Sequence, residues 1–251
     1  MERPWKRARL LGLPVDLVRK EDLLRTLPGM ARSGGSHHLV ALNPIKVMRA
    51  QDEADLRAGI EEASVVYPDA VGIVWALRKL YGERLPVLPG CELMEDIFAL
   101  AARERWGAWL VGARPEVLER VRERLGREHE GMRIVGAHHG YFADGEQPDL
   151  VRRIVADRPE VLFVAMGAHR QETFVRAVQA AGGVPVILTV GGSFDAYTGA
   201  VPRPPRWLLR LHLEWLYRLV RQPFRAPRMA ALPRFACRVL QLRYARQHAA
   251  P

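Results

Sequence analysis

Short apolar runs alternate with helical periodicity from His37 onward. The runs are continuous and apolar, as strands buried on both faces of a sheet are, and they read HHLVALN, SVVYPD, GAWLVGA, MRIVGA, EVLFVAMGA and PVILTVGG. Between them, apolar residues recur at helical spacing, which predicts helices over residues 46–61, 71–81, 92–105, 115–127, 149–157 and 170–181. This repeated succession predicts a doubly wound, mostly parallel Rossmann-like α/β sheet with helices on both faces.

The alternation stops at a cluster of prolines. Pro202, Pro204 and Pro205 follow the stretch GGSFDAYTGAV, and no strand pattern comes after them. We therefore predict a Rossmann-like α/β core over residues 1–202 and a helical appendage over residues 203–251.

The appendage shows an amphipathic helical pattern over residues 207–221. At about 100° per residue, the arginines and the large apolar residues fall on opposite sides of the helix. Pro223 ends this predicted helix. A second helix is predicted to begin near Arg228 and to be interrupted by Pro233.

The positive charge of the chain belongs to the appendage. The formal net charge is +10, and residues 203–251 hold 11 Arg, no Lys and a single acidic residue, Glu214. Basic and acidic groups cancel in residues 1–202. A basic face beside Trp and Leu is typical of a lid over phosphate or of a contact with an anionic membrane. A nucleic-acid-binding protein would also be basic, but the apolar residues at helical spacing and the neutral core argue against nucleic acid.

Several classes of protein are disfavoured by the composition and by missing motifs. No apolar stretch is long enough for a transmembrane helix, and the N-terminal apolar run breaks at Asp16, too early for a signal peptide. Cys91 and Cys237 form neither a disulfide framework nor a metal site, which suits a cytoplasmic protein. The absence of G-x-x-x-x-G-K-[ST], of G-x-G-x-x-G after the first strand and of D-x-D argues against a helicase, an NAD-dependent epimerase or dehydrogenase, and a metal-bound nucleotide.

Six fragments stand in the order and spacing of one protein family: ALNPIKVMRA, VVYPDAVGIVWALR, GAHHGYF, MGAHRQETF, VGGSFDAYTGAVPRPP and LEWLYRLVRQPFRAPR. Over roughly residues 8–240 the chain resembles the WecG/TagA/CpsF glycosyltransferases, glycosyltransferase family 26. The resemblance implies a metal-independent inverting enzyme without a cofactor. Its substrates would be a UDP-sugar, carrying N-acetylmannosamine or a related sugar, and an undecaprenyl-diphosphate-linked acceptor. It would act in cell-surface polysaccharide synthesis, peripherally at the inner face of the plasma membrane.

Asp69 stands where the family has its proposed general base. It follows a predicted buried strand and precedes a predicted helix, at the carboxyl edge of the sheet. A carboxylate there could accept the proton of an acceptor hydroxyl as that hydroxyl attacks the anomeric carbon. An Asp in this place could equally N-cap the next helix. The residues alone leave both interpretations open, and the resemblance favours the base.

Three further residues match substrate-binding positions of the family. Asn43 matches a position associated with the donor pocket, and an Asn-Pro turn is its alternative. Gln171 is expected to open a helix, where its amide could hydrogen-bond a sugar or a phosphate. Asp195 resembles a nucleotide-contacting position, and an Asx-turn is its alternative.

Arg218, Arg225 and Arg228 match the C-terminal arginines of the family, which are thought to close over the active site. The departing UDP carries negative charge on its diphosphate, and guanidinium groups can bind phosphate through two parallel hydrogen bonds. Arg206, Arg210 and Arg221 are expected to face anionic lipid or solvent instead.

The chain departs from the usual family residues at five positions, with Ala41 for Thr, Ala70 for Gly, Val87 for Arg, Glu92 for Asp and His169 for Pro. Ala41 and Ala70 stand near the proposed base. They leave open a non-catalytic relative that binds a lipid-linked sugar without transferring it. The sequence also does not determine the donor sugar, the acceptor or the oligomeric state. It is compatible with a homo-oligomer.

Overall fold

The computed structural model describes residues 3–201 and 229–248. Within these ranges six parallel strands form one sheet in the order β4-β3-β8-β7-β5-β6, and β1 and β2 form a separate antiparallel hairpin. The strands are β1 (Arg7–Leu10), β2 (Leu13–Asp16), β3 (His37–Leu42), β4 (Val65–Pro68), β5 (Gly107–Gly112), β6 (Arg133–His138), β7 (Val161–Ala165) and β8 (Val186–Thr189). Strands β4, β5, β7 and β8 are buried along their whole length. The predicted parallel α/β sheet is therefore confirmed.

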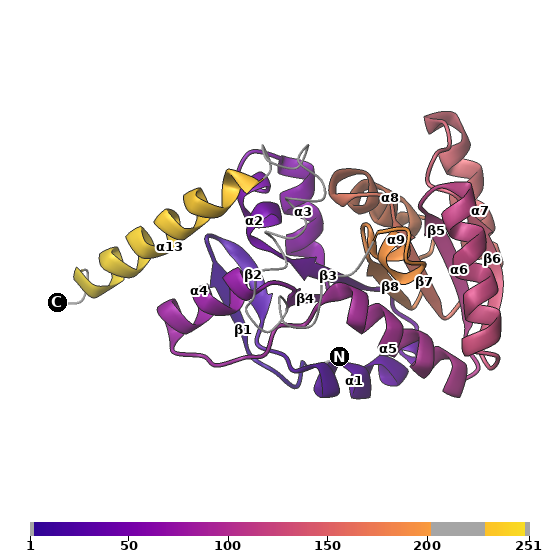
Figure 1. Ribbon diagram of the computed structural model, residues 1–251, viewed down its shortest axis with the longest axis horizontal. Helices are drawn as coiled ribbons and strands as arrows, with labels where there is room; N and C mark the ends of the chain where they lie inside the picture. The colour runs from indigo at the N-terminus through magenta and orange to yellow at the C-terminus, as the bar shows by residue number, and fades with distance from the viewer. Residues whose placement is uncertain (1–2, 202–228, 249–251) are drawn as a thin grey trace.

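Helices cover both faces of the sheet (Figure 1). One face carries α1 (Lys20–Arg32), α5 (Gly90–Arg103), α6 (Pro115–Glu128) and α9 (Ser193–Tyr197). The opposite face carries α2 (Pro44–Arg49), α3 (Ala54–Glu62), α4 (Val71–Tyr81), α7 (Gln147–Ala156) and α8 (Ala168–Ala180). Successive residues of β3 alternate between the two apolar layers, since Leu39 packs into the first and Val40 into the second.

The N-terminal hairpin and α1 precede the alternation of strands and helices, which begins in the sequence at His37. The turn between the two short strands is Leu11-Gly12, and both residues have positive φ, 49° and 87°. Two-residue turns of this kind match the right-handed twist of paired strands, and glycine adopts the second φ at no steric cost. The fully buried Asp16 carboxylate accepts the backbone N–H of Val66 at 2.7 Å. The hairpin therefore protects the outer edge of β4.

The helix predicted over residues 46–61 is in fact two helices, α2 and α3. Helix α2 begins earlier than predicted, because Asn43 caps it and Pro44 occupies its first position, where a missing N–H costs nothing. The chain then turns through Gln51 and Asp52, which are exposed and polar. The other predicted helices begin and end within a few residues of their observed bounds.

The C-terminal helix α13 (Ala231–His248) packs against α2 and α4 (Figure 1). Phe235 and Val239 are buried in the apolar layer that α2, α3 and α4 form with the hairpin. The interruption predicted near Pro233 is present as a turn at Ala230, between the helical residue Met229 and the start of α13. Pro233 itself lies in the first turn of α13, where no intrahelical partner exists for an N–H. The helix predicted over residues 207–221 and the proline cluster at 202–205 lie outside the described residues.

Candidate active site

Four of the predicted site residues follow the carboxyl ends of four neighbouring strands. Asn43 directly follows β3 and Asp69 directly follows β4, whereas Gln171 and Asp195 lie in the helices after β7 and β8. Strands β4, β3, β8 and β7 are consecutive and parallel, so their carboxyl ends meet along one edge. Open parallel sheets bind their ligands at this edge. The fold thus brings the four residues to one side of the molecule.

Asp69 is half-buried and is held by the start of α5. Its Oδ1 accepts the backbone N–H of Gly90, the first residue of α5, at 2.5 Å. The N-cap position of α4 belongs to Ala70, so Asp69 stands one residue before it. Its role as a general base stays a prediction.

The backbone at Ala70 needs no glycine. Its φ of −134° lies in the extended region, which any residue adopts, so the methyl group that departs from the family pattern adds no backbone strain. Ala41, the other departure near Asp69, pairs with Tyr67 across β3 and β4.

Tyr67 is a fully buried neighbour of Asp69 that the sequence did not single out. A Cβ built on Gly90 would lie 3.2 Å from the Tyr67 hydroxyl and 3.3 Å from Asp69 Oδ1, so both groups crowd the start of α5. Burial and then the negative charge of Asp69 raise the pKa of Tyr67 well above its usual range, which keeps the phenol neutral. Among the described residues this hydroxyl finds no hydrogen-bond partner. A tyrosine in an apolar strand is typical of a core residue, so periodicity gave no signal for it.

Asn43 and Gln171 each direct a side-chain oxygen to a backbone N–H. Asn43 Oδ1 accepts the N–H of Lys46 at 2.9 Å and so caps α2. Gln171 is buried, and its Oε1 accepts the N–H of Gly191 at 3.2 Å, which joins the start of α8 to the loop after β8. These bonds fix the orientation of both amides, whose NH₂ groups would be the donors that a ligand meets.

Asp195 lies half-buried in the first turn of α9. Its backbone carbonyl accepts the N–H of Val201 at 3.1 Å. Arg218, Arg225 and Arg228 lie outside the described residues, as do Arg206, Arg210 and Arg221. The structure therefore places four of the seven predicted site residues.

A buried cluster of polar side chains, which we call the buried cluster, lies where α2 and α8 meet the sheet. It consists of His38, Lys46, Glu172 and Thr189, which are all at most 6% exposed. Lys46 Nζ lies 3.2 Å from Glu172 Oε1, and His38 Nε2 lies 3.5 Å from Glu172 Oε2. Sequence reasoning missed the cluster, because its members come from four separate elements, β3, α2, α8 and β8, and no spacing in the sequence connects them.

The buried cluster makes the stability of the protein depend on pH through His38. Burial lowers the pKa of His38 to about 4, although the Glu172 carboxylate raises it. Below about pH 6.5 the unfolded chain binds a proton at this residue that the folded protein does not bind until about pH 4. The free energy of unfolding should therefore fall by up to about 3 kcal/mol as the pH drops from 6.5 to 4.

Urea unfolding at pH 7 and pH 4.5 measures this effect. A His38→Gln variant should lack that part of the pH dependence, whereas His248→Gln, at an exposed position near the end of α13, should keep it. Equal pH dependence in wild type and His38→Gln would show that another group is responsible.

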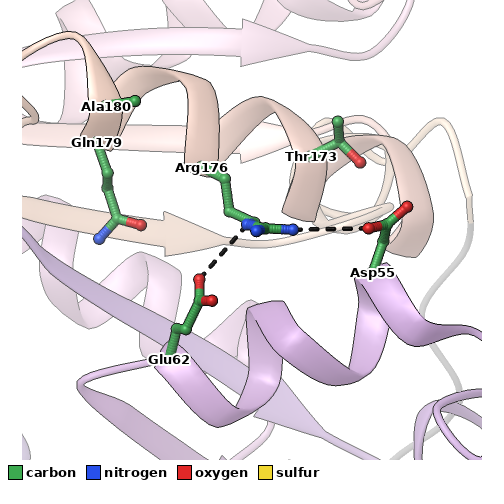
Figure 2. A pocket seen from close by; sticks show the side chains of 6 residues that line it. All are labelled: Asp55, Glu62, Thr173, Arg176, Gln179 and Ala180. Carbon is green, nitrogen blue, oxygen red and sulfur yellow. Dashed lines mark ion pairs between the residues drawn. The ribbon is translucent and has the colours of Figure 1, made fainter.

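An open hollow of about 430 Å³ lies between α3 and α8, on the outside of the molecule (Figure 2). Arg176 of α8 lies in its centre and pairs with Asp55 and Glu62 of α3, at 3.6 and 3.4 Å. None of the predicted site residues lines this hollow. The ion pairs at its centre are exposed and join the two helices.

In residues 3–201 and 229–248, no group of three or more His, Cys, Asp or Glu side chains is arranged to hold a metal ion. Nor is any helix in these ranges long and apolar enough to cross a membrane.

A comparison with models of known families gives a match to the WecG/TagA/CpsF family of glycosyl transferases over residues 8–249. The match begins at the second residue of β1 and spans the rest of the hairpin, the whole sheet and all but the end of the C-terminal segment. It confirms the resemblance carried by the six fragments. With its Rossmann-like parallel sheet, this protein belongs to the WecG/TagA/CpsF glycosyltransferase family.

Proposed function

We propose that this protein is a metal-independent inverting glycosyltransferase that takes N-acetylmannosamine or a related sugar from UDP. The acceptor is an undecaprenyl-diphosphate-linked sugar, and the product serves cell-surface polysaccharide synthesis. The observation that supports this most is the position of Asp69. It lies at the carboxyl edge of the parallel sheet, beside the residues that follow the three neighbouring strands.

In the proposed reaction, the Asp69 carboxylate takes the proton of an acceptor hydroxyl. The hydroxyl oxygen attacks the anomeric carbon from the side opposite UDP, and the bond from that carbon to the diphosphate oxygen breaks. The electron pair leaves on UDP, so the sugar changes its anomeric configuration. The bond from Gly90 N–H to Oδ1 fixes the orientation of the carboxylate.

The donor is proposed to bind along the ends of β3, β7 and β8. Asn43 and Gln171 would hydrogen-bond the sugar or the diphosphate, and Asp195 would contact the nucleotide. Arg218, Arg225 and Arg228 would meet the charge that develops on the departing diphosphate, a task for which guanidinium is suited because it stays charged.

Residues 203–251 are also proposed to contact the anionic inner face of the plasma membrane, peripherally. Eleven arginines and one acidic residue stand in this stretch. On α13, Leu240 and Tyr244 stand four residues apart on one side of the helix and are exposed, and the same helix carries exposed arginines at 238 and 246. Basic side chains beside exposed apolar ones favour the interface of an anionic bilayer.

The proposal is tested by incubating the protein with a panel of UDP-sugars and a short-chain lipid-diphosphate acceptor. We expect UDP release that requires the acceptor and is fastest with UDP-N-acetylmannosamine or a close relative. UDP binding without UDP release from any donor would instead identify a non-catalytic relative. Tight, strongly salt-dependent binding of RNA or DNA would favour a nucleic-acid-binding protein.

Chelators are not expected to stop the reaction. The sequence holds no D-x-D motif, and the C-terminal arginines can neutralise the leaving diphosphate. The rate of UDP release should therefore be the same with EDTA as without it. Loss of activity in EDTA, with recovery on adding Mg²⁺ or Mn²⁺, would contradict the metal-independent mechanism.

A further inference from the structure

We infer that the buried ion pair between Lys46 and Glu172 positions the donor-binding side chains. It joins the start of α2 to the start of α8 and so sets the spacing of Asn43 and Gln171. The inference rests on the proposed function, because it assigns a task behind the proposed donor pocket. Lys46 and Glu172 are positioning residues here, since they are buried and do not touch the substrate themselves.

The pair belongs to a continuous polar path along the sheet edge. Lys46 donates its backbone N–H to Asn43 Oδ1 and holds Glu172 Oε1 with its ammonium group at 3.2 Å. Gln171 directly precedes Glu172 in α8, and its Oε1 accepts the backbone N–H of Gly191. The path therefore links the carboxyl ends of β3, β7 and β8, although Lys46 and Glu172 are 126 residues apart in the sequence.

The second oxygen of Glu172 faces the sheet. Thr189 donates its hydroxyl proton to the carbonyl of Leu39, so Thr189 Oγ1 is an acceptor for His38 Nε2, 3.4 Å away. This assigns the His38 proton to Nε2, which also lies 3.5 Å from Glu172 Oε2. Among the described residues that carboxylate oxygen has no hydrogen-bond partner, so Lys46 is the group that Glu172 pairs with directly.

Helix α3 closes the cluster from the outside. A Cβ on Gly59 would lie 3.2 Å from Glu172 Cβ and 3.4 Å from its Oε2, so the backbone of α3 packs directly on this side chain. The glycine is needed for this close approach. Glu172 is consequently fixed from four elements: α2, α3, β3 and α8 itself.

Stability alone is a weak reason for such a pair. Removing two opposite charges from water costs about as much as their attraction returns, and apolar residues of similar volume often replace a buried pair without loss of stability. A buried ion pair does, however, define one geometry, since each charge must find its partner. The geometry defined here is the spacing between α2 and α8 at the sheet edge.

The Lys46–Glu172 pair and Asp69 are held by helices on opposite faces of the sheet. Lys46 and Glu172 belong to helices of one face, whereas α5, which holds Asp69, covers the other. Loss of the pair should therefore weaken donor binding and leave the proposed base in place. Binding lost equally in the ground state and the transition state raises KM and leaves kcat unchanged.

The test is the double variant Lys46→Met with Glu172→Gln, which removes both charges and keeps similar volumes. We expect it to fold, with the KM for the UDP-sugar and the Kd for UDP raised about 10- to 100-fold, the range seen when residues that support metal ligands are lost. The kcat and the acceptor KM should change less than about threefold.

Amide hydrogen exchange provides a readout that needs no activity. In the double variant the backbone N–H groups of residue 46 and Gly191, which bond Asn43 and Gln171, should exchange about tenfold faster or more than in wild type. The amide of Phe163 in β7 should keep its wild-type rate and so report that the core is intact. If wild type neither binds nor uses a UDP-sugar, the proposed function fails, and exchange still tests the positioning role.

The control is Arg176→Met with Glu62→Gln, which removes one charge of each sign from the exposed pair joining α8 to α3 (Figure 2). It should leave KM and both exchange rates unchanged. A folded Lys46/Glu172 double variant with wild-type KM and exchange would overturn the inference. A double variant that does not fold would overturn it too, because the pair would then hold the core as a whole.

Discussion

Asp69→Asn should lower kcat by at least about 10²-fold while UDP binding survives, because an amide cannot accept the proton of the acceptor hydroxyl. The substitution keeps an Oδ1 acceptor for the Gly90 N–H, so the start of α5 should stay in place. Steady-state UDP release measures kcat, calorimetry measures UDP binding, and thermal unfolding confirms that the variant is folded.

Asp69→Ala is the comparison that separates the two roles of this side chain. It removes both the base and the acceptor for Gly90, so it should lose activity and also unfold at a lower temperature than Asp69→Asn. Asp149→Asn, on the exposed face of α7, is the matched control and should behave as wild type. Wild-type turnover by Asp69→Asn, with donor and acceptor established, would rule out Asp69 as the base.

The double variant Arg225→Ala with Arg228→Ala should also lower kcat about 10²-fold or more, since removal of a single group that stabilises developing negative charge commonly costs this much. Its binding to anionic phosphatidylglycerol vesicles should largely survive. Each surface-engaged basic residue contributes about 1 kcal/mol to such binding, and nine of the 11 arginines after residue 202 remain. UDP release and vesicle sedimentation measure the two effects separately.

Arg25→Ala with Arg152→Ala is the control for charge, because both arginines are well exposed on α1 and α7. This variant should match wild type in both assays. If Arg225→Ala with Arg228→Ala keeps wild-type kcat but loses vesicle binding, these two arginines serve the membrane and not the diphosphate.

The sequence by itself determined the layered architecture and the edge at which the candidate site lies. Strands buried on both faces appear as continuous apolar runs, and helices between them keep their own period, so the order of elements could be predicted directly. Once the sheet is parallel, Asn43, Asp69, Gln171 and Asp195 must all fall at its carboxyl edge. The six fragments likewise sufficed to predict the family that the comparison then confirmed.

The order of strands was decided only by the tertiary structure. Periodicity shows that a strand is buried but not which strand pairs with it, and β8 lies between β3 and β7 through contacts that are distant in the sequence. That order places Asn43 close to Gln171. Only the tertiary structure also shows that Phe235 and Val239 of α13 pack on α2 and α4, the helices after β3 and β4.

The partners of the polar side chains also depended on the tertiary structure. The bond of Asp69 to Gly90 and the pairing of Lys46 with Glu172 join residues from different elements, and no spacing in the sequence indicates either. A lone polar residue in an apolar run has the same periodicity whether it is solvated or buried. Packing in the folded protein decides whether that residue is removed from water. Removal from water costs free energy, so a buried polar residue needs a partner that offsets this cost.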